Sequence, residues 1–231
     1  MCRVELSLDY AVLLLPGLLH GLKYTLGLFT LTLLFSLPLG LPIALGSICR
    51  FWPVRMLCRL YVWIFRGTPL MLQLFFFFFV LAIIANETEL PFLRLSRFGA
   101  AVVTFTLNYA AYFAEIYRGG IQSIDRGQFE AAKTLGFTRT RTMFKIIIPQ
   151  TIRRLIPPVS NETITLVKDT ALANVISTPE LMKAAKDAVN RDTNLTAYLM
   201  AAIIYLGITF ALTYVYQKLE KRFSRHEQEA V

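Results

Sequence analysis

Nine positions of a largely apolar segment hold several polar or ionisable side chains, among them Asn161, Glu162, Thr165, Lys168 and Asp169. At about 100° per residue, Glu162 and Asp169 lie within about 20° of each other on a helical wheel, and Thr165 falls on the same side. Such a stripe offers acceptors for an ammonium group and donors for a carboxylate, the two charged ends of a free amino acid. We therefore predict a binding stripe for a zwitterion.

Other roles for this stripe are alternatives at this level. Glu162 and Asp169 would form the acid and base of an intramembrane enzyme, although about 10 Å of helix axis separates them and no nucleophile accompanies them. A third possible function is an ion channel in which the carboxylates form an acidic constriction. The positive charge of Lys168 on the same stripe is unfavourable for such a channel. Structurally, Lys168 would pair with a carboxylate between helices, or Glu162 would be solvated near the membrane surface.

The composition is that of a membrane protein. Hydrophobic residues make up 55% of the 231, only 17% are charged, and the mean hydropathy is +0.53. A spanning helix needs about 20 apolar residues. The sequence predicts one all-α polytopic domain over 1–231 with five spans. Their predicted ranges are 18–48, 61–85, 98–116, 157–177 and 196–216.

Gln73 is the only strongly polar side chain in the middle of the second predicted span. It is a second candidate for contact with a substrate. A buried contact between helices is an equally good explanation for a polar side chain at this depth.

Basic residues gather in alternate loops, and this pattern sets the orientation. The net charge is +9, from 24 Lys and Arg against 15 Asp and Glu. The loop after the first span, the loop between the third and fourth, and the C-terminal segment are basic, whereas the other two loops are nearly balanced. By the positive-inside rule, the N-terminus is outside and the C-terminus cytoplasmic. The charge thus follows topology and indicates no nucleic-acid partner.

Neither a metal site nor a nucleotide site is indicated. Cys2, Cys49 and Cys58 lack metal-type spacing, and His20 and His226 stand apart from any cluster of ligands. The phosphate-binding pattern GxxxxGK[ST] is absent. We expect no cofactor in this chain.

A charged cytoplasmic segment, residues 123–150, lies between two apolar parts of the chain. Asp125 is a good N-cap, and Gly136 is a good C′ residue for the helix that follows. Thr138 would cap a second short helix, which Pro149 would end. The pattern predicts a helix, a glycine turn and a helix.

This segment has two readings. A basic loop held against anionic lipid fits its charge. However, the small Ala131 and Ala132 beside Glu130 form a surface for close approach, and a rigid turn at Gly136 suits insertion into a protein cleft.

The same residues carry a resemblance. Residues 130–149, EAAKTLGFTRTRTMFKIIIP, resemble the EAA loop of permease subunits of bacterial ABC importers. Residues 65–76, 114–136 and 161–177 are similar to the polar amino-acid permeases of the histidine, arginine and glutamine type. Within the loop, residues 137–142, FTRTRT, depart from the commonest pattern, in which a bulky side chain is frequent.

The resemblance implies an assembly in the bacterial inner membrane. Two five-spanning permeases, either copies or sister chains, would stand on a dimer of ATP-binding subunits and receive an amino acid from a periplasmic binding protein. ATP and Mg²⁺ would bind to the partner subunits, and membrane lipid would surround the spans.

It also implies residue roles. The coupling surface for the ATPase would include Glu130, Ala131, Ala132, Gly136 and Pro149. The substrate site in the permease dimer would be lined by Asn161, Glu162, Lys168 and Asp169.

A short amphipathic helix is predicted after the fourth span, in the segment STPELMKAAKDAV. Ser177 or Thr178 would cap it, with Pro179 at its first position and Glu180 in its first turn. It would lie on the outer surface, either as a docking surface for the binding protein or as a simple connector.

The predicted orientation can be tested by labelling. Ser123→Cys and Thr88→Cys are placed singly in a background without the native cysteines. An impermeant thiol reagent should modify position 88 in intact cells and spare position 123, because only the loop that contains position 88 faces outward. Labelling of position 123 with position 88 protected would reverse the topology.

Overall fold

All regular elements in the described part of the chain are helices, as the sequence predicts. The computed structural model describes the backbone of residues 8–228 and the side chains of residues 9–223, so Cys2 and the side chain of His226 lie outside it. The α-helices are α1 (Leu8–Ile48), α2 (Trp52–Gly67), α3 (Leu70–Phe75), α4 (Leu81–Glu87), α5 (Arg97–Gln122), α6 (Arg126–Thr134), α7 (Arg139–Thr142), α8 (Ile148–Asp169), α9 (Leu181–Asp192) and α10 (Thr196–Gln228). Short π-helical turns at Phe76–Val80 and Met143–Ile147 join α3 to α4 and α7 to α8, and 3-10 turns occupy Pro91–Leu93 and Thr170–Ile176.

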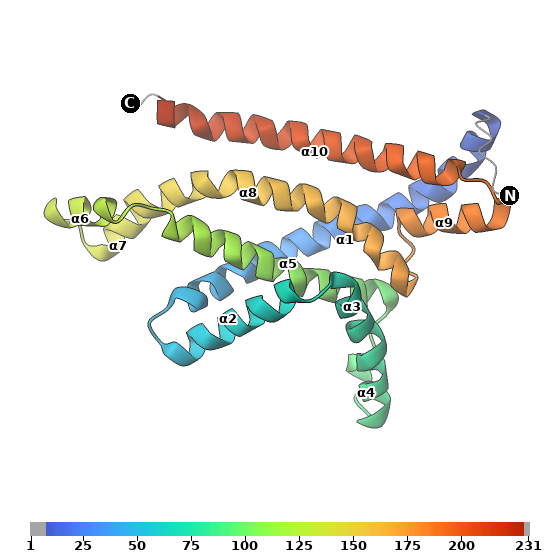
Figure 1. Ribbon diagram of the computed structural model, residues 1–231, viewed down its shortest axis with the longest axis horizontal. Coiled ribbons are helices and arrows are strands. Elements are labelled where there is room, and N and C mark those ends of the chain that lie inside the picture. The colour runs from blue at the N-terminus through green and yellow to red at the C-terminus, as the bar shows by residue number, and fades with distance from the viewer. Residues whose placement is uncertain (1–7, 229–231) are drawn as a thin grey trace.

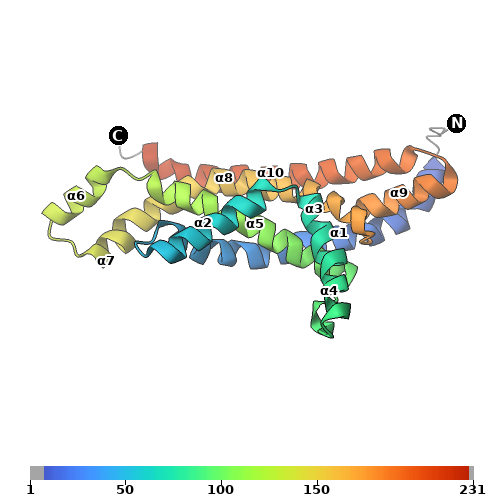
Figure 2. The ribbon, with the colours of Figure 1, turned by 60° about the horizontal axis from the view of Figure 1, so that its bottom comes forward.

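The long helices α1, α5, α8 and α10 form an elongated bundle (Figures 1 and 2). The main core lies between α1, α5 and α8, where Leu28, Phe105, Phe113 and Leu166 are buried. Helix α1 approaches α5 closely: a Cβ atom added at Gly40 would lie 3.0 Å from the Cβ atom of Phe113. Small residues allow this kind of backbone approach between membrane helices.

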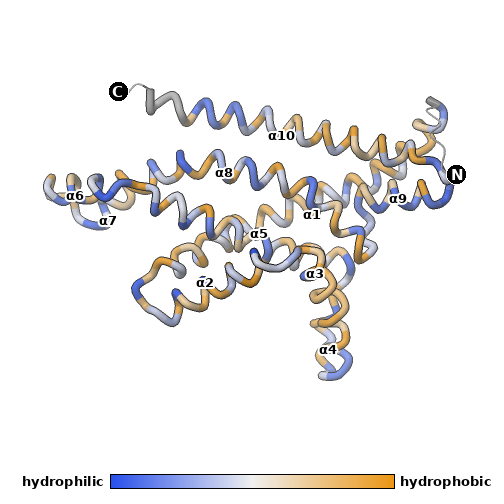
Figure 3. The backbone as a smooth tube through the Cα atoms, in the orientation of Figure 1, coloured by the Kyte–Doolittle hydropathy of each residue, from blue (hydrophilic) through white to orange (hydrophobic). Residues whose placement is uncertain are grey.

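Three helical segments among the described residues are long and apolar enough to cross a membrane: Asp9–Ile48, Leu70–Glu87 and Thr196–Phe223. Figure 3 shows hydrophilic residues along α6, α7 and α9, at opposite ends of the bundle, and a mostly hydrophobic middle. Helices α5 and α8 are less apolar because they carry the polar rows described below.

The second predicted span, 61–85, is wrong as a single helix. Helix α2 ends at Gly67, and Thr68 and Pro69 are extended before α3 begins. A residue that precedes proline is disfavoured in the helical conformation, and proline offers no N–H group. From this break, α3 and α4 project to one side of the bundle (Figures 1 and 2).

Two buried amides satisfy the backbone at the break. The Gln73 Nε2 atom donates to the carbonyl oxygen of Phe65 at 2.9 Å and to Thr68 Oγ1 at 2.7 Å. The Asn108 Nδ2 atom, on α5, donates to the same Phe65 oxygen and to Gln73 Oε1, each at 3.0 Å. Both residues are nearly inaccessible, at 8% and 4% exposure. A broken helix in a membrane requires such internal partners.

The prolines in and just before the fourth predicted span do not mark helix boundaries. The chain is helical from Arg139 through α7, a π turn and α8 to Asp169, so Pro149 does not end a helix and Pro157 does not begin one. The π turn Met143–Ile147 ends two residues before Pro149. Its altered hydrogen-bond pattern reduces what is lost with the missing N–H group of that proline.

Helix α9 is capped by Glu180, and neither Ser177 nor Thr178 caps it. The Glu180 carboxylate accepts hydrogen bonds from the backbone N–H groups of Met182 at 2.7 Å and Lys183 at 2.6 Å, and from the Tyr205 hydroxyl at 3.1 Å. Ser177 is instead left-handed, with φ of 57°, and ends the preceding 3-10 turn. Glu180 has no exposed surface, and burial raises its carboxyl pKa to about 7.

Removing one amide at the break should destabilise the protein. Gln73→Leu leaves the Thr68 hydroxyl and the Asn108 side chain short of partners, which should cost about 1–3 kcal/mol. Thermal unfolding of the purified protein in detergent measures this. Gln217→Leu, at an exposed position on α10, is the matched control. Equal unfolding temperatures for the two variants would show that the amide pair does not hold the break.

Candidate functional site

The predicted stripe lies along one side of α8. Glu162, Thr165 and Asp169 are half-buried, and Asn161 and Lys168 are exposed. Val167, on the opposite side, is fully buried in the bundle. Two carboxylates therefore sit on a partly accessible helix face, as the helical wheel predicts.

Helix α5 presents a second polar row that the sequence analysis missed. Tyr109, Tyr112, Glu115, Arg118 and Gln122 follow at spacings of three and four residues, which places them along one side of the helix. The Tyr109 hydroxyl donates to Asp169 Oδ2 at 2.8 Å and so joins this row to α8. The spacing of polar residues at three and four positions was the signal available in the sequence.

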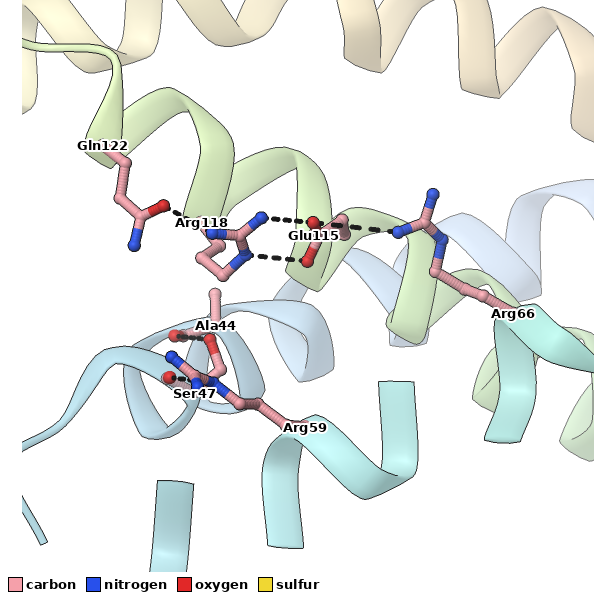
Figure 4. A network of polar contacts seen from close by, with 7 residues as sticks. All are labelled: Ala44, Ser47, Arg59, Arg66, Glu115, Arg118 and Gln122. Atoms are coloured by element: carbon pink, nitrogen blue, oxygen red, sulfur yellow. Dashed lines mark hydrogen bonds and ion pairs between the residues drawn. The ribbon is translucent and has the colours of Figure 1, made fainter. Parts of the chain in front are cut away.

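An ion-pair network occupies the α5 row beside α2 (Figure 4). Arg118 donates to both oxygens of Glu115, from Nε to Oε2 at 2.8 Å and from Nη2 to Oε1. Arg118 Nη1 also donates to Gln122 Oε1. Arg66, at the end of α2, lies farther away, with its Nη1 atom 3.9 Å from Glu115 Oε1. Glu115 thus has a close partner and a distant one.

This network borders an open hollow of about 520 Å³. Arg59, Arg66 and Arg118 line it with Glu115, so three guanidinium groups face one carboxylate. Arg59 is engaged on another side, because its Nε atom donates to the carbonyl oxygen of Ser47 at 3.2 Å. The residues that line the hollow therefore carry an excess of positive charge.

Gln73 does not lie on the α8 stripe. Its amide nitrogen and oxygen are both engaged at the break between α2 and α3, as described above. This arrangement matches the alternative in which the side chain holds helices together.

The segment around Gly136 has the predicted geometry. The Asp125 carboxylate accepts from the backbone N–H of Gly127 at 2.8 Å, and the Thr138 hydroxyl accepts from that of Arg141 at 3.4 Å. Gly136 has φ of +75°. The N–H of Phe137 donates to the carbonyl of Ala132, and that of Gly136 to the carbonyl of Lys133, each at 3.0 Å. This pair of bonds is the Schellman pattern, which glycine favours.

Exposure divides the predicted coupling residues. Glu130, Ala131, Gly136 and Pro149 are exposed, whereas Ala132 is buried against the chain's own side chains. Three large apolar side chains in the same segment are also exposed: Phe129, Leu135 and Phe144. Helices α6 and α7 extend beyond α5 at one end of the bundle (Figures 1 and 2), so this apolar surface has no cover from other helices there.

No group of three or more His, Cys, Asp or Glu side chains within the described residues is arranged to hold a metal ion. The polar rows on α5 and α8 present hydrogen-bonding groups and charges. Such groups suit reversible binding of a charged solute.

Comparison with known proteins gives consistent results. Residues 36–225 match the family model described as binding-protein-dependent transport system inner membrane component. The L-cystine transport system permease protein TcyB of Bacillus subtilis (strain 168) is 40% identical over 213 residues, which cover 91% of this chain and 88% of that protein. The arginine transport system permease protein ArtQ of the same organism is 34% identical, with 96% and 100% covered. A solved structure described as an amino acid ABC transporter with histidines matches with a TM-score of 0.86 at 30% identity and covers 95% of this chain and 100% of that one.

Proposed function

Because the chain belongs to the family of binding-protein-dependent transport system inner membrane components, we propose that it is the permease subunit of an importer that carries a polar or cationic amino acid across the bacterial inner membrane. The observation that carries this proposal is the half-buried acidic stripe of α8, which lies in a chain similar to permeases named for cystine and arginine transport. Intramembrane carboxylates mark solute pathways more often than they serve packing alone.

In the proposed importer, this chain works together with several partner proteins. Two permeases, which are copies or sister chains, stand on a dimer of ATP-binding subunits, and a periplasmic binding protein delivers the amino acid. ATP and Mg²⁺ bind to the ATP-binding subunits, since this chain has no phosphate-binding loop. Exposed apolar side chains at Phe129, Leu135 and Phe144 support a protein partner for α6 and α7 over lipid headgroups alone.

The proposed topology has five crossings with the N-terminus periplasmic and the C-terminus cytoplasmic. Helix α1 makes the first crossing, and α2 to α4 together make the second through the break at Thr68. Helices α5, α8 and α10 make the other three. The basic loops support this orientation, and it places α6 in the cytoplasm as the coupling helix.

Roles in substrate binding follow from the chemistry of the α8 stripe. Asp169 accepts the α-ammonium group, and Glu162 accepts a second cation when the side chain carries one. Asn161, Thr165 and Lys168 supply neutral or cationic contacts along the same pathway. Gln73 holds the break between α2 and α3 and acts on the site through that break, because its amide atoms are already engaged.

Neutralising the stripe carboxylates tests the proposed function. Glu162→Gln or Asp169→Asn removes one charge partner in a poorly hydrated site, which should weaken apparent affinity roughly a hundredfold. The measurement is ATP-driven uptake of labelled amino acid by proteoliposomes that contain the assembled complex and the binding protein. Glu87→Gln, at an exposed position, should leave uptake unchanged. Unaltered half-saturation and rate in both stripe variants would make the stripe structural.

A second prediction concerns the coupling segment. Gly136→Pro removes an N–H group that bonds to Lys133 and excludes a positive φ, so substrate-stimulated ATPase activity should fall roughly tenfold. Glu130→Lys should act similarly by reversing a docking charge. Gly136→Asn tolerates the left-handed conformation and serves as the control. Wild-type stimulation in both Gly136→Pro and Glu130→Lys would remove this segment from the coupling path.

A further inference from the structure

Arg66 is a cation whose hydrogen-bond donors are free. A guanidinium carries five N–H groups, yet within the described part of the chain Arg66 donates no hydrogen bond. Its contact with Glu115 at 3.9 Å is too long for a hydrogen bond. The side chain is 40% exposed.

The position of Arg66 is nevertheless well defined. Its guanidinium stacks on the Tyr112 ring, with Cζ 5.1 Å from the ring centroid. Its helix ends one residue later, at the break that Gln73 and Asn108 hold. The residue is therefore presented by a fixed helix end at the edge of the hollow.

Glu115 does not satisfy this arginine. Both Glu115 oxygens already accept close hydrogen bonds from Arg118 (Figure 4). The Arg118 guanidinium is paired with Glu115 through two hydrogen bonds, whereas the in-plane N–H groups of Arg66 have no acceptor among the described residues. Two parallel N–H groups of this kind match the two oxygens of a carboxylate.

Arg66 also lies near the acidic stripe. It interacts electrostatically with Glu162, while Asp169 lies farther along α8, toward its C-terminal end. A zwitterion that sets its ammonium group against the stripe needs a cation on the other side. Lys168 is exposed and forms no hydrogen bond or ion pair within the described residues, but it belongs to the same helix as the carboxylates.

We propose that Arg66 binds the α-carboxylate of the transported amino acid through its free N–H groups, while the α8 stripe holds the ammonium group. This inference rests on the proposed transport function and extends it to an element, α2, that the sequence analysis did not assign to the site. It makes the end of α2 a determinant of specificity for amino acids over amines and amides.

Direct binding tests this assignment without the binding protein, which would select the solute first. The assembled permease and ATPase complex is placed in lipid nanodiscs, and binding of labelled L-arginine, L-histidine and L-cystine is measured alongside competition by their α-amides. In the wild type, the amides should compete about tenfold less well, because they lack the anionic group. Arg66→Gln should weaken acid binding about tenfold to a hundredfold and leave amide binding unchanged.

Two variants separate this role from others. Arg66→Lys keeps the positive charge but loses the paired N–H groups of the guanidinium, so it should retain only part of the affinity for the amino acids. Arg94→Gln removes an exposed cation outside the hollow and should keep binding within about twofold. Equal loss of acid and amide binding in Arg66→Gln would indicate a structural role and overturn the proposal.

A lipid phosphate is the other ligand with matching chemistry. If Arg66 bound a lipid phosphate, the effect of Arg66→Gln would require phosphatidylglycerol and vanish in phosphatidylcholine nanodiscs, which would contradict the proposal.

Absence of amino-acid binding to the wild type, or unchanged binding in Arg66→Gln, would also contradict the proposal. Wild-type proteoliposomes that import at least one of the three amino acids would then show that the transport function still stands. Import of none would instead refute that function.

Discussion

A polypeptide inside a membrane must satisfy its backbone polar groups from within, and the break between α2 and α3 is the place where this constraint is hardest to meet. Thr68 and Pro69 interrupt the helix, and the carbonyl groups of Phe65 and Thr68 would otherwise lack donors. The amides of Gln73 and Asn108 supply them. Because one of these amides belongs to α5, the break also fixes the end of α2 against that helix.

Much of the polar arrangement depends on this junction. It sets Arg66 over the Tyr112 ring and near Glu115, and one turn away along α5 the Tyr109 hydroxyl reaches Asp169 on α8. Helix α5 therefore connects the positively charged hollow to the acidic stripe. In the proposed site, the cation at the end of α2 and the carboxylates of α8 together complement a zwitterion, and neither helix provides both charges alone.

Local sequence patterns predicted the features that depend on neighbouring residues. The cap at Asp125, the left-handed turn at Gly136 and the shared side of Glu162 and Asp169 all follow from short-range geometry, and the structure has each of them. The prediction that Pro149 ends a helix was wrong, because the preceding π turn lets the helix continue through this proline. The break at Thr68, the buried cap Glu180 and the row on α5 depend on contacts between distant segments, which periodicity does not reveal.

In the proposed binding mode, an amino acid lies between the α8 stripe and the end of α2. A structure of the assembled complex in lipid nanodiscs with a bound amino acid, compared with the same complex without it, tests this directly. We expect density for the ligand with its ammonium group at Asp169 and its carboxylate at Arg66, and an unbroken Gln73 and Asn108 pair beside it. Ligand density remote from both α8 and Arg66 would contradict the claim.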